Sequence, residues 1–208
     1  MGCELSKFVL NGEDLTAEAN DFARHLGLEE VAPGRIARYF LAELYIHTFL
    51  TETIDPRRVV KEIASLEGKG LTQTKPAAAF KGPVLKGLWH KHHQQIGVPA
   101  LAMNVLNEGR QDKWKHIEKH LQSLEGLAIT DTQAWDLAGA LSEEVVRGGL
   151  NRRIERQALT GEWFIFTKYE ELNYYLCLGK HEDDDEELRL RAINSINNHF
   201  PFLRHLLS

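Results

Sequence analysis

Cysteine is scarce in this sequence. Only two of its 208 residues are cysteine, Cys3 and Cys177, and they lie far apart in the chain. Two such positions cannot build the disulfide framework of a small secreted scaffold, and this usage suits a reducing compartment. We therefore expect a cytoplasmic protein that is stabilised by an apolar core, which a chain of this length can build.

Long apolar runs are also missing. No stretch reaches the eighteen or so apolar residues that a membrane-spanning helix needs, and the first residues lack the charged and then apolar pattern of a secretory leader. The sequence therefore predicts no transmembrane segment. Gly2 and Ser6 do fit the pattern for N-myristoylation, with Cys3 placed for a second acyl chain, so we expect membrane attachment only if Gly2 is lipidated.

The motifs of several enzyme classes do not occur. The sequence has no Gly-rich phosphate loop, no Gly-x-Ser-x-Gly elbow, no His-Glu-x-x-His and no Cys-x-x-Cys pair, which disfavours nucleotide-driven and thiol chemistry. We expect no cofactor. The formal net charge of −5 argues against a protein that coats nucleic acid with its whole surface, but it leaves room for local basic patches.

The periodicity of apolar residues predicts a predominantly helical α+β fold in one compact domain. We expect a helical N-terminal part at residues 1–66, a loop at 67–82, and a helical region with a C-terminal β-hairpin and a final helix at 83–208. The predicted helices before the hairpin cover residues 16–26, 33–50, 55–66, 83–96, 99–108, 112–124 and 130–146.

Local signals support several of these elements. Asp55 followed by Pro56 predicts a helix start, because a carboxylate at the N-cap and a proline in the first turn both favour one. Residues 162–168 and 173–179 are rich in aromatic and branched side chains and flank a short polar turn, which is typical of a β-hairpin. The acidic run that follows predicts the start of the final helix.

Three histidines within four positions, His90, His92 and His93, mark the first candidate site. If residues 83–96 form a helix, His92 lies on its buried stripe, whereas His90 and His93 share a polar face with Lys86. If Gly82-Pro83 does not start a helix, His90 and His92 share a face instead, and a different choice of site residues follows.

Histidine and basic residues without a convincing metal site fit the cleavage of RNA through its 2′-hydroxyl. One imidazole takes the hydroxyl proton, a second acid protonates the leaving oxygen, and a fixed cation stabilises the developing charge. We predict a catalytic set of His90 and His93 as base and acid, with Lys86 and Arg153 as the stabilising cations. The leading hypothesis is therefore a small metal-independent ribonuclease or phosphodiesterase, a hydrolase of the kind used as a bacterial toxin or defence protein.

Aromatic and basic residues supply the predicted RNA contacts. Aromatic side chains stack on bases, and arginines clamp phosphates. A local excess of positive charge runs from Arg147 to Lys168, and it contains two glycines that suggest a helix end or a flexible turn. The predicted substrate-binding residues are Trp89, Arg147, Arg152, Arg156 and Tyr174.

Two other classes of function remain open. One is a non-catalytic protein-protein interaction module, in which the aromatic hairpin and the acidic helix bind a protein partner and lipidation of Gly2 and Cys3 attaches the chain to a membrane. The other is a metal-dependent hydrolase that would combine the His90/His93 pair with His116 and His120, which are four residues apart. Neighbouring lysines disfavour a divalent cation there.

Overall fold

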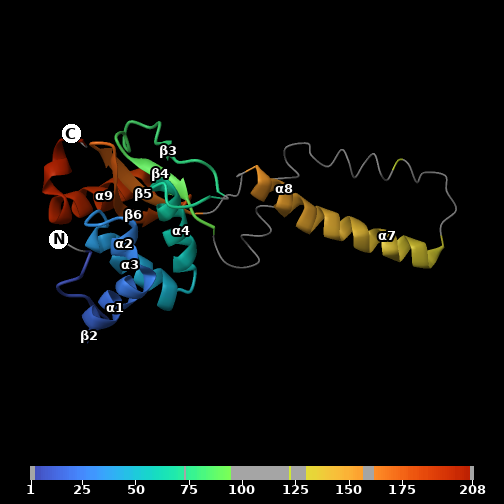
Figure 1. The fold of residues 1–208 in the computed structure, drawn as a ribbon, viewed down its shortest axis with the longest axis horizontal. Coiled ribbons are helices and arrows are strands. Elements are labelled where there is room, and N and C mark those ends of the chain that lie inside the picture. Colours follow the sequence, from blue (N-terminus) through green and yellow to red (C-terminus); the bar gives the residue numbers. More distant parts are fainter. Residues whose placement is uncertain (1–2, 73, 95–121, 123–129, 157–161, 207–208) are drawn as a thin grey trace. The chain divides into compact units, whose positions relative to one another are not determined.

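A computed structural model describes residues 3–72, 74–94, 122, 130–156 and 162–206. The contacts between residues divide the chain into two compact units. The first unit consists of Met1–Ile96 and Thr160–Ser208, and the second is Gly97–Leu159 (Figure 1). The expected α+β class with a helical majority is confirmed, since the structure has 50% helix and 17% strand.

An antiparallel sheet of four strands lies at the centre of the first unit, in the spatial order β3-β4-β5-β6. The predicted hairpin is confirmed as β5 and β6, which are joined at Glu170 and Glu171 with positive φ angles of 48° and 62°. Two left-handed residues in succession match the right-handed twist of the strands that they join. The strands span Ala78–Ala79 (β3), Trp89–His92 (β4), Trp163–Tyr169 (β5) and Leu172–Gly179 (β6).

The helix predicted over residues 83–96 is wrong. Residues 84–87 form a turn, and β4 follows at Trp89–His92. Gly87 has a φ of +88°, a left-handed conformation that interrupts any right-handed helix. Pairing with β5 then satisfies the backbone of β4, with Trp89 opposite Phe166 and His92 opposite Trp163. A strand partner distant in sequence thus overrides the helical spacing of the apolar residues.

Helices cover the sheet and complete the core. In Figure 1 the helices α1 to α4 gather beneath the sheet, and α9 lies beside β6. Phe40 of α3 contacts both Phe164 of β5 and Tyr175 of β6 edge to face, with ring centroids 6.3 and 6.4 Å apart. The described helices of the first unit are α1 (Thr16–Leu26), α2 (Leu28–Val31), α3 (Arg38–Phe49), α4 (Pro56–Leu66), α9 (Asp185–His199) and the 3₁₀ helix η2 (Pro201–Leu206). Two short strands, β1 (Val9–Leu10) and β2 (Glu13–Asp14), pair with each other in a separate antiparallel sheet.

The predicted helix starts are confirmed where capping chemistry marks them. The Asp55 side chain accepts a hydrogen bond from the backbone N–H of Arg57, and Pro56 is the first residue of α4. Asp184 accepts from the N–H groups of Glu186 and Glu187 at the start of α9. On the side of β6 that faces away from β5, the backbone of Tyr175 forms 2.8 Å hydrogen bonds with residues 35 and 37. This edge of the sheet is therefore paired at Tyr175.

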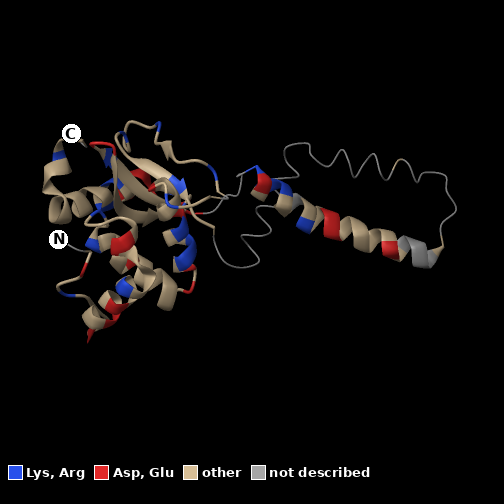
Figure 2. Ribbon diagram, in the orientation of Figure 1, with Lys and Arg blue, Asp and Glu red and all other residues tan. Residues whose placement is uncertain are grey.

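The described part of the second unit is helical. It comprises α7 (Asp131–Glu143), the π-helical turn η1 (Glu144–Gly148) and α8 (Gly149–Glu155). The break expected at Gly148-Gly149 does not occur, because the helix continues through both glycines. In Figure 2 acidic residues lie along α7 and most basic residues lie towards α8, and the two groups meet in the ion pairs of Arg147 with Glu143 and of Arg152 with Glu144. The helices predicted over residues 99–108 and 112–124 lie outside the described residues, apart from residue 122.

Candidate active site

Three strand ends meet at one end of the sheet. Trp163, the first residue of β5, pairs with His92 at the end of β4 on one side and with Gly179 at the end of β6 on the other. The backbone N–H of His93 donates a 2.9 Å hydrogen bond to the carbonyl of Glu162, which extends the pairing by one residue. Side chains just beyond these three strands are therefore held close together.

A cavity of about 250 Å³ lies at this end of the sheet, and we call it the His47–His93 cavity. It draws residues from the end of α3, the loop before α4, and the ends of β4, β5 and β6. Ionisable groups form much of its wall. The lining residues are His47, Thr53, Ile54, His93, Glu162, Leu178, Gly179, Lys180 and Glu182.

His93 is the most unusual of these residues. Its side chain is completely buried, and neither ring nitrogen makes a hydrogen bond to any residue that the structure describes. Burial lowers the pKa of His93 to about 4; the nearby His92 and His47 act in the same direction, and the close backbone of Gln94 acts weakly against them. A buried polar ring without partners destabilises a fold, so its presence in a cavity wall is more typical of a binding or catalytic group than of core packing.

His47 reaches the same cavity from α3. Its Nδ1 atom lies 3.1 Å from the Thr51 hydroxyl and 3.2 Å from the Thr53 hydroxyl, which orients the ring and leaves Nε2 for a ligand. Burial lowers the pKa of His47, and the positive charges of Lys180 and Arg191 lower it further. Both imidazoles of the cavity are therefore biased towards the neutral, proton-accepting form.

The charges around the cavity are mixed in sign. Lys180 is exposed and makes no side-chain hydrogen bond or ion pair with a described residue, whereas Glu162 accepts a 2.9 Å hydrogen bond from the backbone N–H of His181. Behind the wall, Arg191 forms ion pairs with Glu43, at 3.0 Å, and with Asp183. Lys180 is thus the lining cation that is available to a ligand.

An aromatic cluster lies on the opposite face of the sheet at the same end. It consists of Phe80, His90, His92, Trp163 and His181. The ring centroids of His90 and Trp163 are 5.0 Å apart, those of Phe80 and His90 are 4.7 Å apart, and those of Trp163 and His181 are 4.2 Å apart. His181 is exposed, and Trp163 and His90 are half-buried, so this aromatic cluster presents ring surface to solvent.

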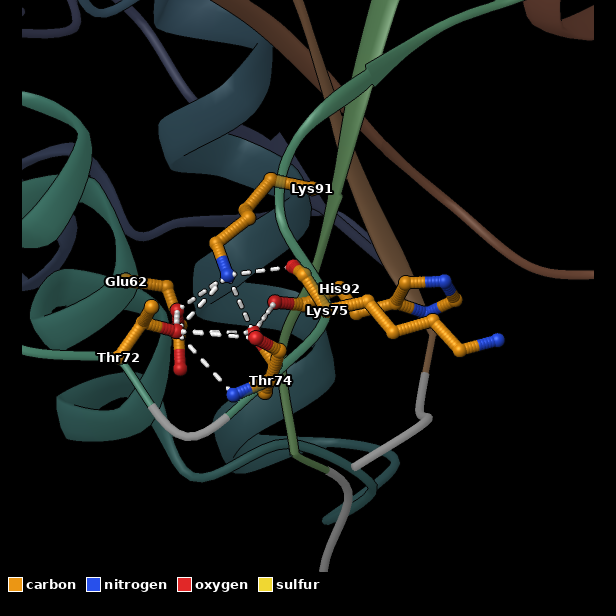
Figure 3. Close-up of polar contacts among 6 residues, drawn as sticks. All are labelled: Glu62, Thr72, Thr74, Lys75, Lys91 and His92. Atoms are coloured by element: carbon orange, nitrogen blue, oxygen red, sulfur yellow. Dashed lines mark hydrogen bonds and ion pairs between the residues drawn. The ribbon is translucent and has the colours of Figure 1, made fainter. Parts of the chain in front are cut away.

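A buried ion pair anchors β4 beside the site (Figure 3). The Lys91 ammonium lies 2.8 Å from the Glu62 carboxylate of α4, and it donates to the hydroxyls of Thr72 and Thr74. Thr74 in turn donates a 3.0 Å hydrogen bond to the backbone carbonyl of His92. The loop after α4 is therefore fastened to the last residues of β4, which fixes the position from which His93 enters the cavity.

The structure separates the two histidines that sequence spacing predicts as base and acid. In β4 the side chains of His90 and His92 point to one face, and Lys91 and the following His93 point to the other. His90 therefore belongs to the aromatic cluster, while His93 lines the cavity. Lys86 is exposed in the turn before β4 and does not line the cavity.

The aromatic residues predicted to contact RNA also lie elsewhere. Trp89 packs against Phe166 on the face of β4 opposite His90, and the Lys168 ammonium lies 4.0 Å from the centroid of its ring. Tyr174 contacts Phe200 and Phe202 near the C-terminal segment. Neither residue lines the His47–His93 cavity.

The predicted arginines belong to the second unit. Arg147 and Arg152 form the ion pairs already described, and Arg156 donates a 2.9 Å hydrogen bond to the carbonyl of Arg152. Arg153, expected to be a catalytic cation, is buried, with 2% of its surface exposed. These four residues share one helical segment rather than the cavity wall.

Sequence reasoning did not select His47 or Lys180 as site residues. His47 lies in a strongly apolar predicted helix, where its spacing indicates a packing role. Lys180 follows a predicted strand, and nothing in the sequence distinguishes it from other surface lysines. The pairing of β4 with β5, which the spacing did not predict, brings His93 to the end of the sheet where β6 and α3 hold Lys180 and His47.

A metal centre finds no support in the described residues. Among them no three His, Cys, Asp or Glu side chains are grouped so that they could hold a metal ion. The other half of the predicted metal site, His116 and His120, lies outside the described residues.

Comparison with protein families, with curated proteins and with solved structures gave no match to this chain. In the part of the chain that the structure describes, no helix has the length and apolarity needed to cross a membrane. The fold and the cavity alone define the class to which we assign the protein: an α+β protein with a candidate acid-base site at one end of its sheet.

Proposed function

We propose that the protein is a metal-independent phosphodiesterase that cleaves RNA in the His47–His93 cavity. The single observation that supports this most strongly is His93, a fully buried imidazole without a hydrogen-bond partner among the described residues, in a cavity wall that also contains His47 and Lys180. Perturbed titratable groups that converge in a cavity are a physical mark of acid-base catalysis.

The roles of the two histidines follow from their burial. His93 is fully buried and His47 only in part, so His47 takes up a proton first as the pH falls. Neutral His93 is then the general base, and protonated His47 is the general acid. This arrangement requires that the pKa of the base lie below that of the acid, which matches the strong lowering of the pKa of His93 to about 4.

The reaction is an internal transesterification. His93 removes the proton of the RNA 2′-hydroxyl, and the 2′-oxygen forms a bond to phosphorus while the bond from phosphorus to the 5′-oxygen breaks. His47 gives its proton to that leaving oxygen, and the Lys180 ammonium stabilises the charge on the phosphorus-bound oxygens. The products are a 2′,3′-cyclic phosphate and a free 5′-hydroxyl, and the imidazoles then exchange their protons with water.

The aromatic cluster supports RNA as the substrate. Its exposed and half-buried rings lie at the same end of the sheet as the cavity, and unpaired bases stack on such rings with little dependence on sequence. DNA lacks the 2′-hydroxyl and so provides no internal nucleophile. A site that contains two imidazoles and an ammonium fits a substrate that carries its own nucleophile.

A cleavage assay in the presence of a chelator tests this proposal. The purified protein is incubated in EDTA with a labelled single-stranded RNA and with DNA of the same sequence. We expect cleavage of the RNA alone, with a 2′,3′-cyclic phosphate at the new end, and a loss of about 10²- to 10⁴-fold in rate for His47→Asn and His93→Asn. His25→Asn, an exposed histidine of α1, is the matched control.

The proposal fails if folded wild-type protein cleaves no RNA without added metal. It also fails if the two cavity variants, shown to be folded by their thermal transitions, cleave as fast as the His25→Asn control. A use of this activity as a toxin or in defence would appear as growth arrest on expression in bacteria, relieved by His93→Asn.

The interaction module has less support in the first unit. The side chains of Phe164, Phe166 and Leu176 in the hairpin are completely buried, so they form core rather than a docking surface. Lipidation by two chains is also disfavoured, because Cys3 is 1% exposed and its backbone N–H donates to Glu29. Gly2 lies outside the described residues.

A further inference from the structure

A second cavity, of about 260 Å³, lies between the N-terminal segment, the start of α3 and the end of α9. We call it the Arg38 cavity. All of it belongs to the first unit, and it shares no lining residue with the His47–His93 cavity. The lining residues are Leu5, Ser6, Lys7, Phe8, Arg38, Tyr39, Ala42, Asn194, Ser195, Asn198 and His199.

The ionisable lining of the Arg38 cavity is basic. Lys7, Arg38 and His199 line it, and none of its lining residues is acidic. Three carboxylates beside this wall are already engaged: Glu4 forms a 3.2 Å ion pair with Arg24, Glu29 accepts from the backbone N–H groups of Cys3 and Gly34, and Glu43, which interacts with the Tyr39 hydroxyl, forms a 3.0 Å ion pair with Arg191. Positive charge in this cavity is therefore left without compensation from its own wall.

Arg38 has its terminal nitrogens available. Its Nε–H donates a 2.8 Å hydrogen bond to the backbone carbonyl of Glu4, which fixes the plane of the guanidinium. Neither terminal nitrogen makes a hydrogen bond or ion pair with a described residue. A guanidinium held in this way presents further N–H donors in a fixed geometry, the arrangement that binds a phosphate or a carboxylate.

His199 adds a donor of defined direction. Its Nδ1 accepts the backbone N–H of Arg38 at 3.4 Å, so the neutral ring carries its proton on Nε2. Burial and then the charge of Arg38 lower the pKa of His199. A negative ligand would offset the effect of Arg38, so binding and protonation of this ring should favour each other.

Uncharged groups complete the wall. Asn194 and Asn198 lie one turn apart on the exposed side of α9, and Ser6 contributes a hydroxyl. The N-terminus of α3 and the C-terminus of α9 both border the cavity, and their opposite dipole ends offset each other. The side chains therefore determine the charge of the cavity, which is positive. Leu5 and Phe8 form an apolar side of the same cavity.

We propose that the Arg38 cavity binds the phosphate group of a small phosphorylated molecule. The guanidinium of Arg38 and the Nε2–H of His199 contact the phosphate oxygens, Lys7 contributes the remaining positive charge, and the apolar side accommodates the group that carries the phosphate. This site is independent of the RNA-cleaving site proposed above, and neither depends on the other.

Binding is measured by calorimetry and by the shift of the thermal transition, with inorganic phosphate, a nucleoside 5′-monophosphate and a hexose phosphate as separate probes. We expect saturable binding of phosphate, and tighter binding of whichever phosphorylated molecule the apolar side fits. Lys7→Gln removes a side chain that forms no hydrogen bond or ion pair with a described residue, so it should weaken phosphate binding severalfold without changing the unliganded transition.

Arg38→Lys keeps the charge but removes the planar fork, and we expect it to weaken phosphate binding at least tenfold. Arg57→Gln, which removes an exposed charge on α4, is the control and should bind as the wild type does. The proposal is overturned if millimolar phosphate produces neither heat nor a thermal shift. It is equally overturned if acetate binds as well as phosphate, or if Lys7→Gln and Arg38→Lys bind phosphate as the control does.

Discussion

The Lys91 ammonium and the Glu62 carboxylate lie 2.8 Å apart, and about 1% and 6% of these side chains are exposed to solvent. Lys91 also donates to the carbonyl of Lys75 at 2.8 Å, so its three ammonium hydrogens meet four oxygens in all, from a helix and a loop. A cation with this many partners holds a strand, a helix and a loop in one arrangement.

Removing one partner of this pair should destabilise the fold strongly. Lys91→Met leaves the Glu62 carboxylate buried without its counter-charge, and we expect a loss of about 3 to 5 kcal/mol in the free energy of unfolding. Urea denaturation measures it. Lys61→Met, on the exposed side of the same helix, is the control and should change the free energy by less than about 0.5 kcal/mol. Equal stability of the two variants would contradict an ion pair that holds the loop.

The stability of the protein should depend on His93 at mildly acidic pH. The pKa of His93 is about 4 in the folded protein and 6.5 in a free histidine, so the unfolded chain binds a proton first as the pH falls. The contribution of neutral His93 is therefore complete above pH 6.5 and lost between pH 6.5 and about 4. This amounts to about 3 kcal/mol, since one pKa unit corresponds to about 1.4 kcal/mol.

The variant His93→Leu isolates this contribution. It replaces a buried ring without partners by an apolar side chain of similar size, so the free energy of unfolding near pH 7 should not fall by more than about 1.5 kcal/mol. Its stability should also vary less than that of the wild type between pH 6.5 and 4. Identical pH dependence of the two proteins, followed by urea denaturation, would contradict the buried and neutral state of His93.

The rate of RNA cleavage should have a maximum at mildly acidic pH. The base, His93, is available above its pKa of about 4, and the acid, His47, is available only below its own pKa, which burial and nearby cations place under 6.5. The profile of kcat/KM against pH should therefore rise and fall within this window. A rate that increases steadily up to pH 8 would be incompatible with protonated His47 as the acid.

The aromatic cluster should contribute to RNA binding rather than to chemistry. Trp163→Leu removes its largest ring, and we expect RNA binding to weaken by about ten- to a hundredfold while the rate at saturating RNA changes little. Fluorescence anisotropy with a short unpaired RNA measures the affinity. Trp135→Leu, which changes a highly exposed tryptophan of α7, serves as the comparison, and an equal loss in both variants would argue against a stacking role for the cluster.

Local chemistry made much of the fold predictable. Asp55 and Pro56 predict the start of α4, and two aromatic runs around a polar turn predict the hairpin. Both signals could be recognised because each acts between residues that are close in sequence. Strand β4 lacks such a signal. Its four residues become a strand only through pairing with β5, whose partner residues follow about seventy positions later in the chain.

The candidate site was predictable only in part for the same reason. The histidine cluster drew attention to the segment that contains His93, and His93 lines the candidate cavity. The change from helix to strand moved His90 to the other face, as expected for a period of two rather than 3.6. His47 and Lys180 join His93 through contacts between distant segments, which one sequence does not reveal.

The chain leaves the sheet after His93 and returns to it at Glu162, and a backbone hydrogen bond joins these two residues. The chain segment between these two residues therefore begins and ends at the same place in the first unit. Most of this segment belongs to the compact second unit, Gly97–Leu159. Such an insertion can lengthen, shorten or be exchanged at little entropic cost to its host. The architecture is that of a host fold, the first unit, into which the second unit is inserted, and the residues that line the His47–His93 cavity all belong to the host.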